Sequence, residues 1–122
     1  GGFHTGGISG ENSGEISSCS SRAVVSNKIG TNGALGGLIG RNYSKLKNSY
    51  FHGDLNREGK REMEGFLVGI NGHTVKNCYS VREYDKCPLV GKRSKRCAGI
   101  QERNGFTDNI EDAEKAILVN SI

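Results

Sequence analysis

The stretch Gly36-Gly37-Leu38-Ile39-Gly40-Arg41-Asn42 decides the fold, because versions of it recur along the chain at nearly constant spacing. The segment 37–40 aligns with 7–10 at an offset of 30 residues and with 66–69 at an offset of 29. In each copy an asparagine follows two residues after the last glycine. The equivalent glycines and asparagines are Gly7, Gly10 and Asn12, then Gly37, Gly40 and Asn42, then Gly69 and Asn71.

The alignment continues downstream of each asparagine. The later equivalent positions are Ile16, Leu46 and Val75, then Cys19, Ser49 and Cys78, then Ser20, Tyr50 and Tyr79. Pro88-Leu89-Val90-Gly91 suggests a fourth copy that begins after only 22 residues. Three copies in register indicate a repeat architecture rather than a chance match.

The apolar runs in each copy are short and are bounded by Gly, Asn and Ser, which is typical of short strands joined by tight turns. One copy cannot bury its own apolar face, whereas stacked copies can, each strand pairing with its equivalent one coil along. We therefore predict an all-β fold, a parallel β-solenoid of about 30-residue coils. Three strands per coil would suit this length, and the usual handedness of parallel crossovers favours a right-handed coil.

Stacking would place equivalent residues above one another, about 4.8 Å apart. We therefore expect Asn12, Asn42 and Asn71 to form a ladder of side-chain amides along the stack. Cys19, Ser49 and Cys78 would form a column of small inward residues.

The run 36–42, followed by Leu46-Lys47-Asn48-Ser49-Tyr50, resembles the GLUG motif of bacterial surface proteins, and 75–80 is similar to its second half. The match covers residues 6–85 and is weaker in the first copy, where Ser9 and Ser20 replace an apolar and an aromatic residue. The resemblance implies a secreted or surface-anchored bacterial protein. Proteins with this motif include adhesin-like proteins and zinc metallopeptidases that cut immunoglobulin A, where it lies in the non-catalytic part.

Composition fits a single thin domain. The chain has 122 residues, 19 glycines and 34% apolar residues, below the ~45–50% of globular domains that includes glycine. No run approaches the ~20 apolar residues of a membrane span. The chain opens almost inside a coil and without a signal peptide. We therefore expect a fragment of a larger protein with further coils upstream.

We divide the chain into repeat coils at 1–85 and a second part of the same domain at 86–122. The second part combines a basic, cysteine-flanked segment with a helix predicted over 107–118. Asp108 would be its N-cap, and Glu111, three residues later, would complete a capping box. We expect this short amphipathic helix to cap the open end of the stack.

The four cysteines allow one plausible bridge. Cys19 and Cys78 would lie two coils apart, near 9.6 Å, beyond the about 7 Å between Cα atoms that a disulfide allows. Cys87 and Cys97 close an 11-residue segment and are the candidate disulfide, with four reduced thiols as the alternative.

Metal and catalytic chemistry find little support in the sequence. His4, His52 and His73 share no column and no zinc spacing with the cysteines, and the acidic residues form no calcium loop. The repeats also contain no aligned pair of carboxylates, which is the arrangement that glycoside hydrolysis needs. We therefore expect no catalytic residue, no metal, no cofactor and no enzyme activity.

The basic segment is the clearest candidate binding element. Lys92, Arg93, Lys95 and Arg96 would form an anion-binding knob at the end of the stack; the alternative is a solvated loop. No aromatic residues alternate with these cations, so nucleic acid is not the expected partner.

Two classes of function fit. The first is a non-catalytic structural or adhesive repeat of an extracellular or bacterial cell-surface protein, with a host glycan or an extracellular-matrix protein as partner. The second is an accessory domain of a secreted peptidase or glycan-degrading enzyme. A third, an anion- or glycan-binding module, depends on residues 92–96 alone.

Overall fold

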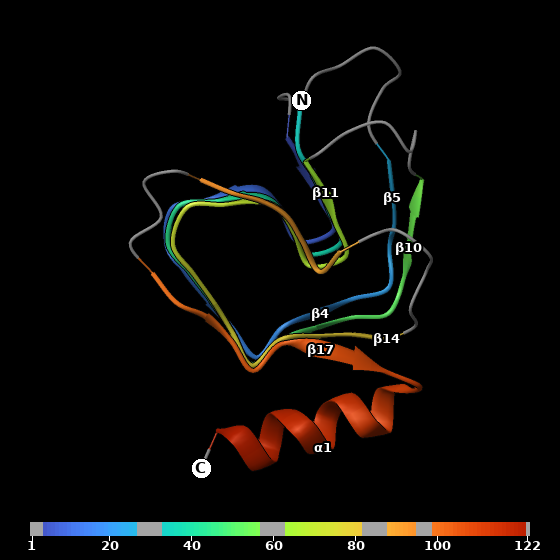
Figure 1. Cartoon of the computed structure of the whole chain (residues 1–122). Coiled ribbons are helices and arrows are strands. Elements are labelled where there is room, and N and C mark those ends of the chain that lie inside the picture. The colour runs from blue at the N-terminus through green and yellow to red at the C-terminus, as the bar shows by residue number, and fades with distance from the viewer. Residues whose placement is uncertain (1–3, 27–32, 57–62, 82–87, 95–98, 122) are drawn as a thin grey trace.

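The protein is a stack of coils whose strands pair in parallel from one coil to the next, as a computed structural model shows (Figure 1). The structure describes residues 4–26, 33–56, 63–81, 88–94 and 99–121. Every strand pairing within these residues is parallel and joins equivalent positions of successive coils. The predicted parallel β-solenoid with a short C-terminal helix is confirmed.

The strands are short. The first coil holds β1 (Thr5–Gly6), β2 (Ser9–Asn12), β3 (Glu15–Ser17), β4 (Ser20–Ser21) and β5 (Val24–Ser26). The second holds β6 (Leu35–Gly36), β7 (Ile39–Asn42), β8 (Lys45–Lys47), β9 (Tyr50–Phe51) and β10 (Asp54–Asn56). The third holds β11 (Glu64–Gly65), β12 (Val68–Asn71), β13 (Thr74–Lys76) and β14 (Tyr79–Val81). Next come β15 (Val90–Arg93), β16 (Gln101–Glu102), β17 (Gly105–Thr107) and α1 (Ile110–Asn120).

These strands form five narrow sheets that make the walls of the solenoid. Their orders are β1-β6-β11, β15-β12-β7-β2, β16-β13-β8-β3, β17-β14-β9-β4 and β10-β5. The first two coils therefore have five short strands each, not the three that suited the repeat length. Several of the breaks contain a glycine, such as Gly7, Gly37 and Gly53, and others contain the left-handed residues Ser18 and Asn48.

The register agrees with the sequence alignment at each position that it pairs. Ile39 lies between Ser9 and Val68, and Leu46 lies between Ile16 and Val75. The fourth copy is also present, because β15 pairs with β12 and places Val90 beside Val68. Stacked coils thus continue past residue 85, the boundary that the sequence suggested.

The predicted asparagine ladder is present at the centre of this register. The Asn12 side-chain amide donates to Asn42 Oδ1 at 3.0 Å, and the Asn42 amide donates to Asn71 Oδ1 at 3.0 Å. Asn71 in turn donates to Gln101 Oε1 at 2.7 Å. Each amide also bonds the backbone of its own turn, as Asn42 does with Ser44 O at 2.9 Å. The ladder therefore fixes both the local turn and the alignment of neighbouring coils.

The apolar core fills the inside of the coils. Side chains that alternate inward along the strands are fully buried in the two middle coils, in keeping with the two-residue period of a strand. The main members are Leu35, Leu38, Ile39, Leu46, Phe51, Phe66, Leu67, Val68, Val75 and Cys78.

One corner of the solenoid is built from left-handed residues. Ser18, Asn48, Asn77 and Arg103 have φ between 51° and 57° and stand at equivalent places, just before β4, β9, β14 and β17. Asparagine tolerates this conformation better than most residues. The Asn77 amide also donates to Asn48 Oδ1 at 2.9 Å, which adds a second contact between coils.

The helix begins one residue later than its predicted cap implied. Asn109 is the N-cap, with an extended backbone (φ −153°, ψ 170°), and its side chain accepts from the Asp112 amide. That hydrogen bond is 2.8 Å long. The prediction of Asp108 as N-cap with Glu111 as box partner is therefore wrong. Asp112 lies three residues after Asn109, so it is Asp112 whose amide lies within reach of the cap.

Gly37 should not tolerate a side chain. A Cβ there would lie against the Phe66 carbonyl oxygen and 2.5 Å from the Phe51 ring. We expect Gly37→Ala to lower the free energy of unfolding by about 3 kcal/mol in urea titrations, because two rigid neighbours must move. Gly14, whose added Cβ would meet nothing within 4 Å, is the matched control. Equal losses for Gly37→Ala and Gly14→Ala would contradict this account of the repeat.

The asparagine ladder should be worth more in the middle than at its end. Asn42 is fully buried and bonds both neighbouring coils, whereas Asn12 bonds one coil among the described residues. We expect Asn42→Ala to cost about 3 kcal/mol in the free energy of unfolding and Asn12→Ala about 1 kcal/mol, since each buried partner left unpaired is costly. Urea titrations of both variants measure this. A larger loss at Asn12 would show that the ladder does not hold the stack together.

Candidate functional site

Helix α1 lies along the outer side of the solenoid and packs on β14 and β17 (Figure 1). A second apolar cluster, outside the coils, holds it there: Ala113 is fully buried against Tyr79 and Val81. This position differs from the expected cap over the end of the stack. Tyr79 and Val81 alternate outward on β14, so this wall offers an apolar outer surface that the helix covers.

Polar contacts fix the two halves of the helix differently. At its C-terminal end, the corner residue Asn77 donates to Ile117 O at 3.0 Å, and Asn120 donates to the Tyr79 hydroxyl at 2.8 Å. Further along, the Tyr50 hydroxyl donates to Glu114 Oε1 at 3.3 Å. The repeat asparagine therefore adds a second donor to the Ile117 carbonyl, which also accepts from the Ser121 amide at the end of the helix.

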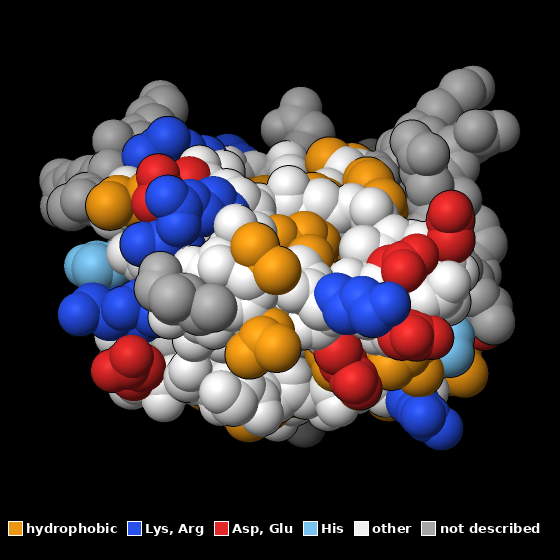
Figure 2. Space-filling view, turned by 90° about the horizontal axis from the view of Figure 1, so that it is seen from below, with side chains coloured by type: hydrophobic (Ala, Val, Ile, Leu, Met, Phe, Trp, Pro, Cys, Tyr) orange, Lys and Arg blue, Asp and Glu red, His pale blue; other side chains and the backbone are white. Residues whose placement is uncertain are grey.

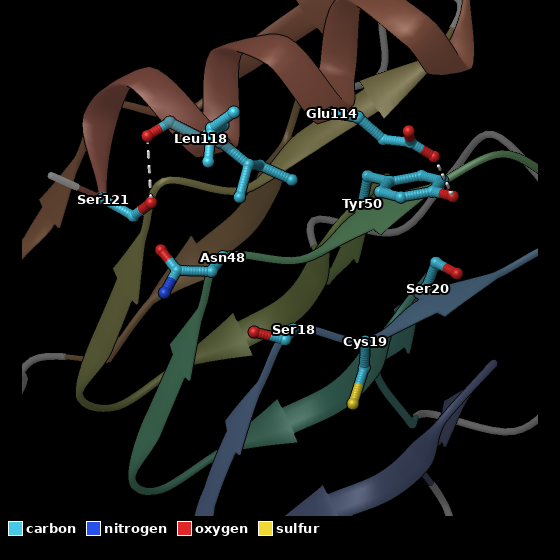
Figure 3. A pocket seen from close by; sticks show the side chains of 9 residues that line it. Ser18, Cys19, Ser20, Asn48, Tyr50, Glu114, Leu118 and Ser121 are labelled. Atoms are coloured by element: carbon cyan, nitrogen blue, oxygen red, sulfur yellow. Dashed lines mark hydrogen bonds between the residues drawn. The ribbon is translucent and has the colours of Figure 1, made fainter.

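A groove remains where the helix passes over the corner of the first two coils. It encloses about 530 Å³ and is lined by Ser18, Cys19, Ser20, Asn48, Tyr50, Glu114, Ile117, Leu118 and Ser121. Figure 3 shows the helix residues on one side and the coil residues on the other. Leu118 is 66% exposed, so its side chain presents apolar surface to solvent at this edge. The groove combines an apolar wall with hydroxyl and amide groups, a combination typical of ligand sites.

A second hollow of about 300 Å³ adjoins the groove and is basic. It is lined by Lys47, Lys76, Arg103, Asn48, Asn77, Asn120 and Ser121. Asn48 and Ser121 line both spaces. Figure 2 looks onto the helix side and shows apolar side chains across the middle, with Lys and Arg side chains gathered toward the left.

The three cations of this hollow are only lightly neutralised. Lys76 pairs with Glu102 at 3.4 Å, and Lys47 reaches Glu15 only at 4.0 Å. Arg103 donates to the Asn120 carbonyl at 3.5 Å. These pairs are partly solvent-exposed and therefore weak, so an incoming anion can compete with them.

The predicted anion-binding segment lies on another wall. Lys92 and Arg93 are exposed on β15, where they pair in register with Ile70 and Asn71, and the Arg93 guanidinium donates to Gly99 O at 3.1 Å. Lys95 and Arg96 lie outside the described residues, so their part in an anion site stays a prediction. The groove and the basic hollow were not found from the sequence. Lys47 and Lys76 stand at equivalent repeat positions, but the helix residues that complete both spaces have no equivalent in the repeat.

Two of the four cysteines lie within the described residues, and two lie outside them. Cys19 is a half-buried free thiol and Cys78 a buried one, and Ser49 stands between them in the column. Ser49 Oγ accepts a hydrogen bond from the Cys19 backbone amide at 3.1 Å. The candidate disulfide Cys87–Cys97 lies outside the described residues and stays a prediction.

Within the described ranges, no three His, Cys, Asp or Glu residues gather closely enough to hold a metal ion. No helix among the same residues is long and apolar enough to cross a membrane. The groove and the basic hollow are therefore the features on which a functional argument rests.

Comparison with known protein families finds a match to the GLUG motif over residues 31–56. The chain contains a GLUG motif. The matched segment contributes β6 to β10 and includes Gly37, Gly40 and Asn42, so the motif corresponds to one coil of the stack. Nothing among curated proteins or solved structures matches the chain.

Cys78 should resist alkylation in the native protein. Burial raises the pKa of the Cys78 thiol from 9.0 to about 12, so both access and thiolate are lacking. We expect iodoacetamide at about pH 8 to label Cys19 first and Cys78 only after unfolding, as peptide mass spectrometry would show. Equally fast labelling of the two native thiols would contradict the burial.

The same residue should make stability fall at high pH. An unfolded thiol loses its proton near pH 9.0, whereas native Cys78 keeps its proton up to about pH 12, so the free energy of unfolding declines as pH rises through that window.

Labelling of the unfolded, unreduced chain tests the predicted disulfide between Cys87 and Cys97. We expect Cys87 and Cys97 to stay unlabelled because they are joined in a disulfide. Labelling of all four cysteines would exclude that disulfide.

Proposed function

We propose that this chain is a non-catalytic structural and adhesive repeat domain of a bacterial cell-surface or secreted protein. The observation that supports this most is the groove along α1, with an apolar wall and an adjoining basic hollow on a rigid stack. A stack of paired coils holds the residues of a binding face in fixed relative positions. In cells that produce it, the full-length protein should be found in the envelope or the medium; a cytosolic location would contradict the proposal.

The ligand class that best fits the groove is a saccharide carrying carboxylate or sulfate groups. Tyr50 and Leu118 offer apolar surface for the C–H face of a sugar ring, while Ser18, Ser20 and Asn48 offer groups that bond hydroxyls. Lys47, Lys76 and Arg103 would pair with the acidic groups in the adjoining hollow. An accessory domain of a secreted peptidase or glycan-degrading enzyme would use the same site.

Binding of heparin-derived oligosaccharides, with neutral dextran oligosaccharides for comparison, tests this. We expect the combined change Lys47→Ala, Lys76→Ala and Arg103→Ala to weaken heparin binding at least about tenfold in titration calorimetry, since charge-assisted contacts are lost. Leu118→Ser should weaken it less and should not affect folding, because Leu118 is already exposed.

Two controls separate the groove from other surfaces. Val119→Ser changes a neighbouring helix residue that is 69% exposed and does not line the groove. Changing Lys92, Arg93, Lys95 and Arg96 to alanine tests the predicted anion-binding segment at residues 92–96 instead. If only this second set abolishes binding, the site lies at residues 92–96 and not in the groove. Equal binding of neutral and acidic oligosaccharides would exclude an anion-specific site.

A further inference from the structure

The left-handed corner keeps one backbone geometry in the last three coils, but its side chain changes. Asn48, Asn77 and Arg103 have φ of 51°, 55° and 57°. The backbone amide of Asn48 donates to the Lys76 carbonyl, and that of Asn77 donates to the Glu102 carbonyl, both at 3.1 Å. The corner is therefore built in the same way each time, and its residue changes from asparagine to arginine in the fourth coil.

Asparagine contributes to the stability of this corner in two ways. Its short polar side chain tolerates the left-handed conformation better than most side chains do. It also joins successive coils, because the Asn77 side-chain amide donates to Asn48 Oδ1 at 2.9 Å. An arginine lacks the first advantage and carries no side-chain acceptor with which to continue the column. Fold stability alone would therefore favour asparagine at position 103.

The change to arginine leaves a buried oxygen atom without a donor. Asn77 directs its side-chain nitrogen toward Asn48 of the second coil and toward the Ile117 carbonyl. Its Oδ1 is buried and has no hydrogen-bond partner among the described residues. A buried acceptor without a donor lowers the stability of the folded state. An asparagine at position 103 would be placed to donate to this oxygen, as Asn77 donates to Asn48.

The Arg103 side chain instead lines the basic hollow, together with Lys47 and Lys76. Its guanidinium donates to the Asn120 carbonyl at 3.5 Å, which is long for a hydrogen bond and holds the side chain weakly. A guanidinium carries five N–H donors in a planar fork that matches two oxygens of one carboxylate or sulfate, whereas a lysine offers a single point of charge. Arg103 is thus the group in this hollow that can make a two-point contact with an acid.

We propose that Arg103 is the specificity-determining residue of the basic hollow. Both arms of its guanidinium bind one oxyanion that offers two oxygens, a carboxylate or a sulfate of an acidic saccharide. Lys47 and Lys76 add positive charge from the neighbouring coils. This assignment rests on the proposed function of the groove and the hollow, and it explains why the corner holds a residue that is less favourable for the fold.

The variant Arg103→Asn separates binding from stability. We expect its melting temperature to rise by about 4 °C, because asparagine suits the left-handed backbone and supplies the missing donor to Asn77 Oδ1. Its binding of oligogalacturonides or of dextran sulfate oligosaccharides should weaken at least about tenfold in titration calorimetry. A lower melting temperature would show that Arg103 mainly holds α1 through Asn120, and it would overturn the proposal.

Two further variants keep the test specific. Arg103→Lys keeps the charge but loses the fork, so binding should weaken about fivefold while the melting temperature stays near that of the wild type. Lys45→Asn removes an exposed positive charge that lines neither the groove nor the hollow, and it should leave binding unchanged.

The two oligosaccharides also distinguish the acid that is bound, since the first carries carboxylates and the second carries sulfates. Full binding by Arg103→Asn would overturn the assignment of Arg103 and leave the proposed function standing. A wild-type protein that binds neither oligosaccharide would overturn both.

Discussion

The column of buried asparagine side chains, each bonded to the next coil, is the interaction on which the structure depends. Its members are 29 or 30 residues apart in the chain and join at 3.0 Å. A side-chain amide carries both a donor and an acceptor, so identical residues can bond one another indefinitely along a stack. Inside the apolar core these bonds have no competition from water, and a slipped register would leave several amides unpaired. The ladder therefore selects one alignment of the coils.

Once that alignment is set, the other structural features repeat from one coil to the next. Apolar residues overlie apolar residues and close a thin core, glycines overlie one another at corners where coils approach closely, and left-handed residues build a single edge. Asn48 and Asn77 lie at this edge, and Asn77 continues outward to bond the helix. The corner thus links the interior of the solenoid to the groove on its outer side.

The sequence predicted the repeating part of the molecule well and the non-repeating part poorly. Periodic residues such as Ile39 and Leu46 have the same environment in every coil, so alignment alone reveals their place. The helix and its cap occur once, without a second copy for comparison. Two adjacent polar residues, Asp108 and Asn109, both suit an N-cap, and only backbone geometry selects Asn109. The docking of the helix on the outer wall depends on Tyr79 and Val81, whose outward direction is set by strand pairing.

The sequence by itself determined the parallel stack, its register and its amide ladder, because these arise from residues that recur at a fixed spacing and meet their own equivalents. Only the tertiary structure decided where α1 lies and what it encloses. Lys47 and Lys76 share a repeat position, but Leu118 and Asn120 come from the helix, so no spacing in the chain reveals that all of them border adjoining hollows. Their proximity results from stacking plus the packing of one amphipathic helix, and the second of these leaves no periodic trace in the sequence.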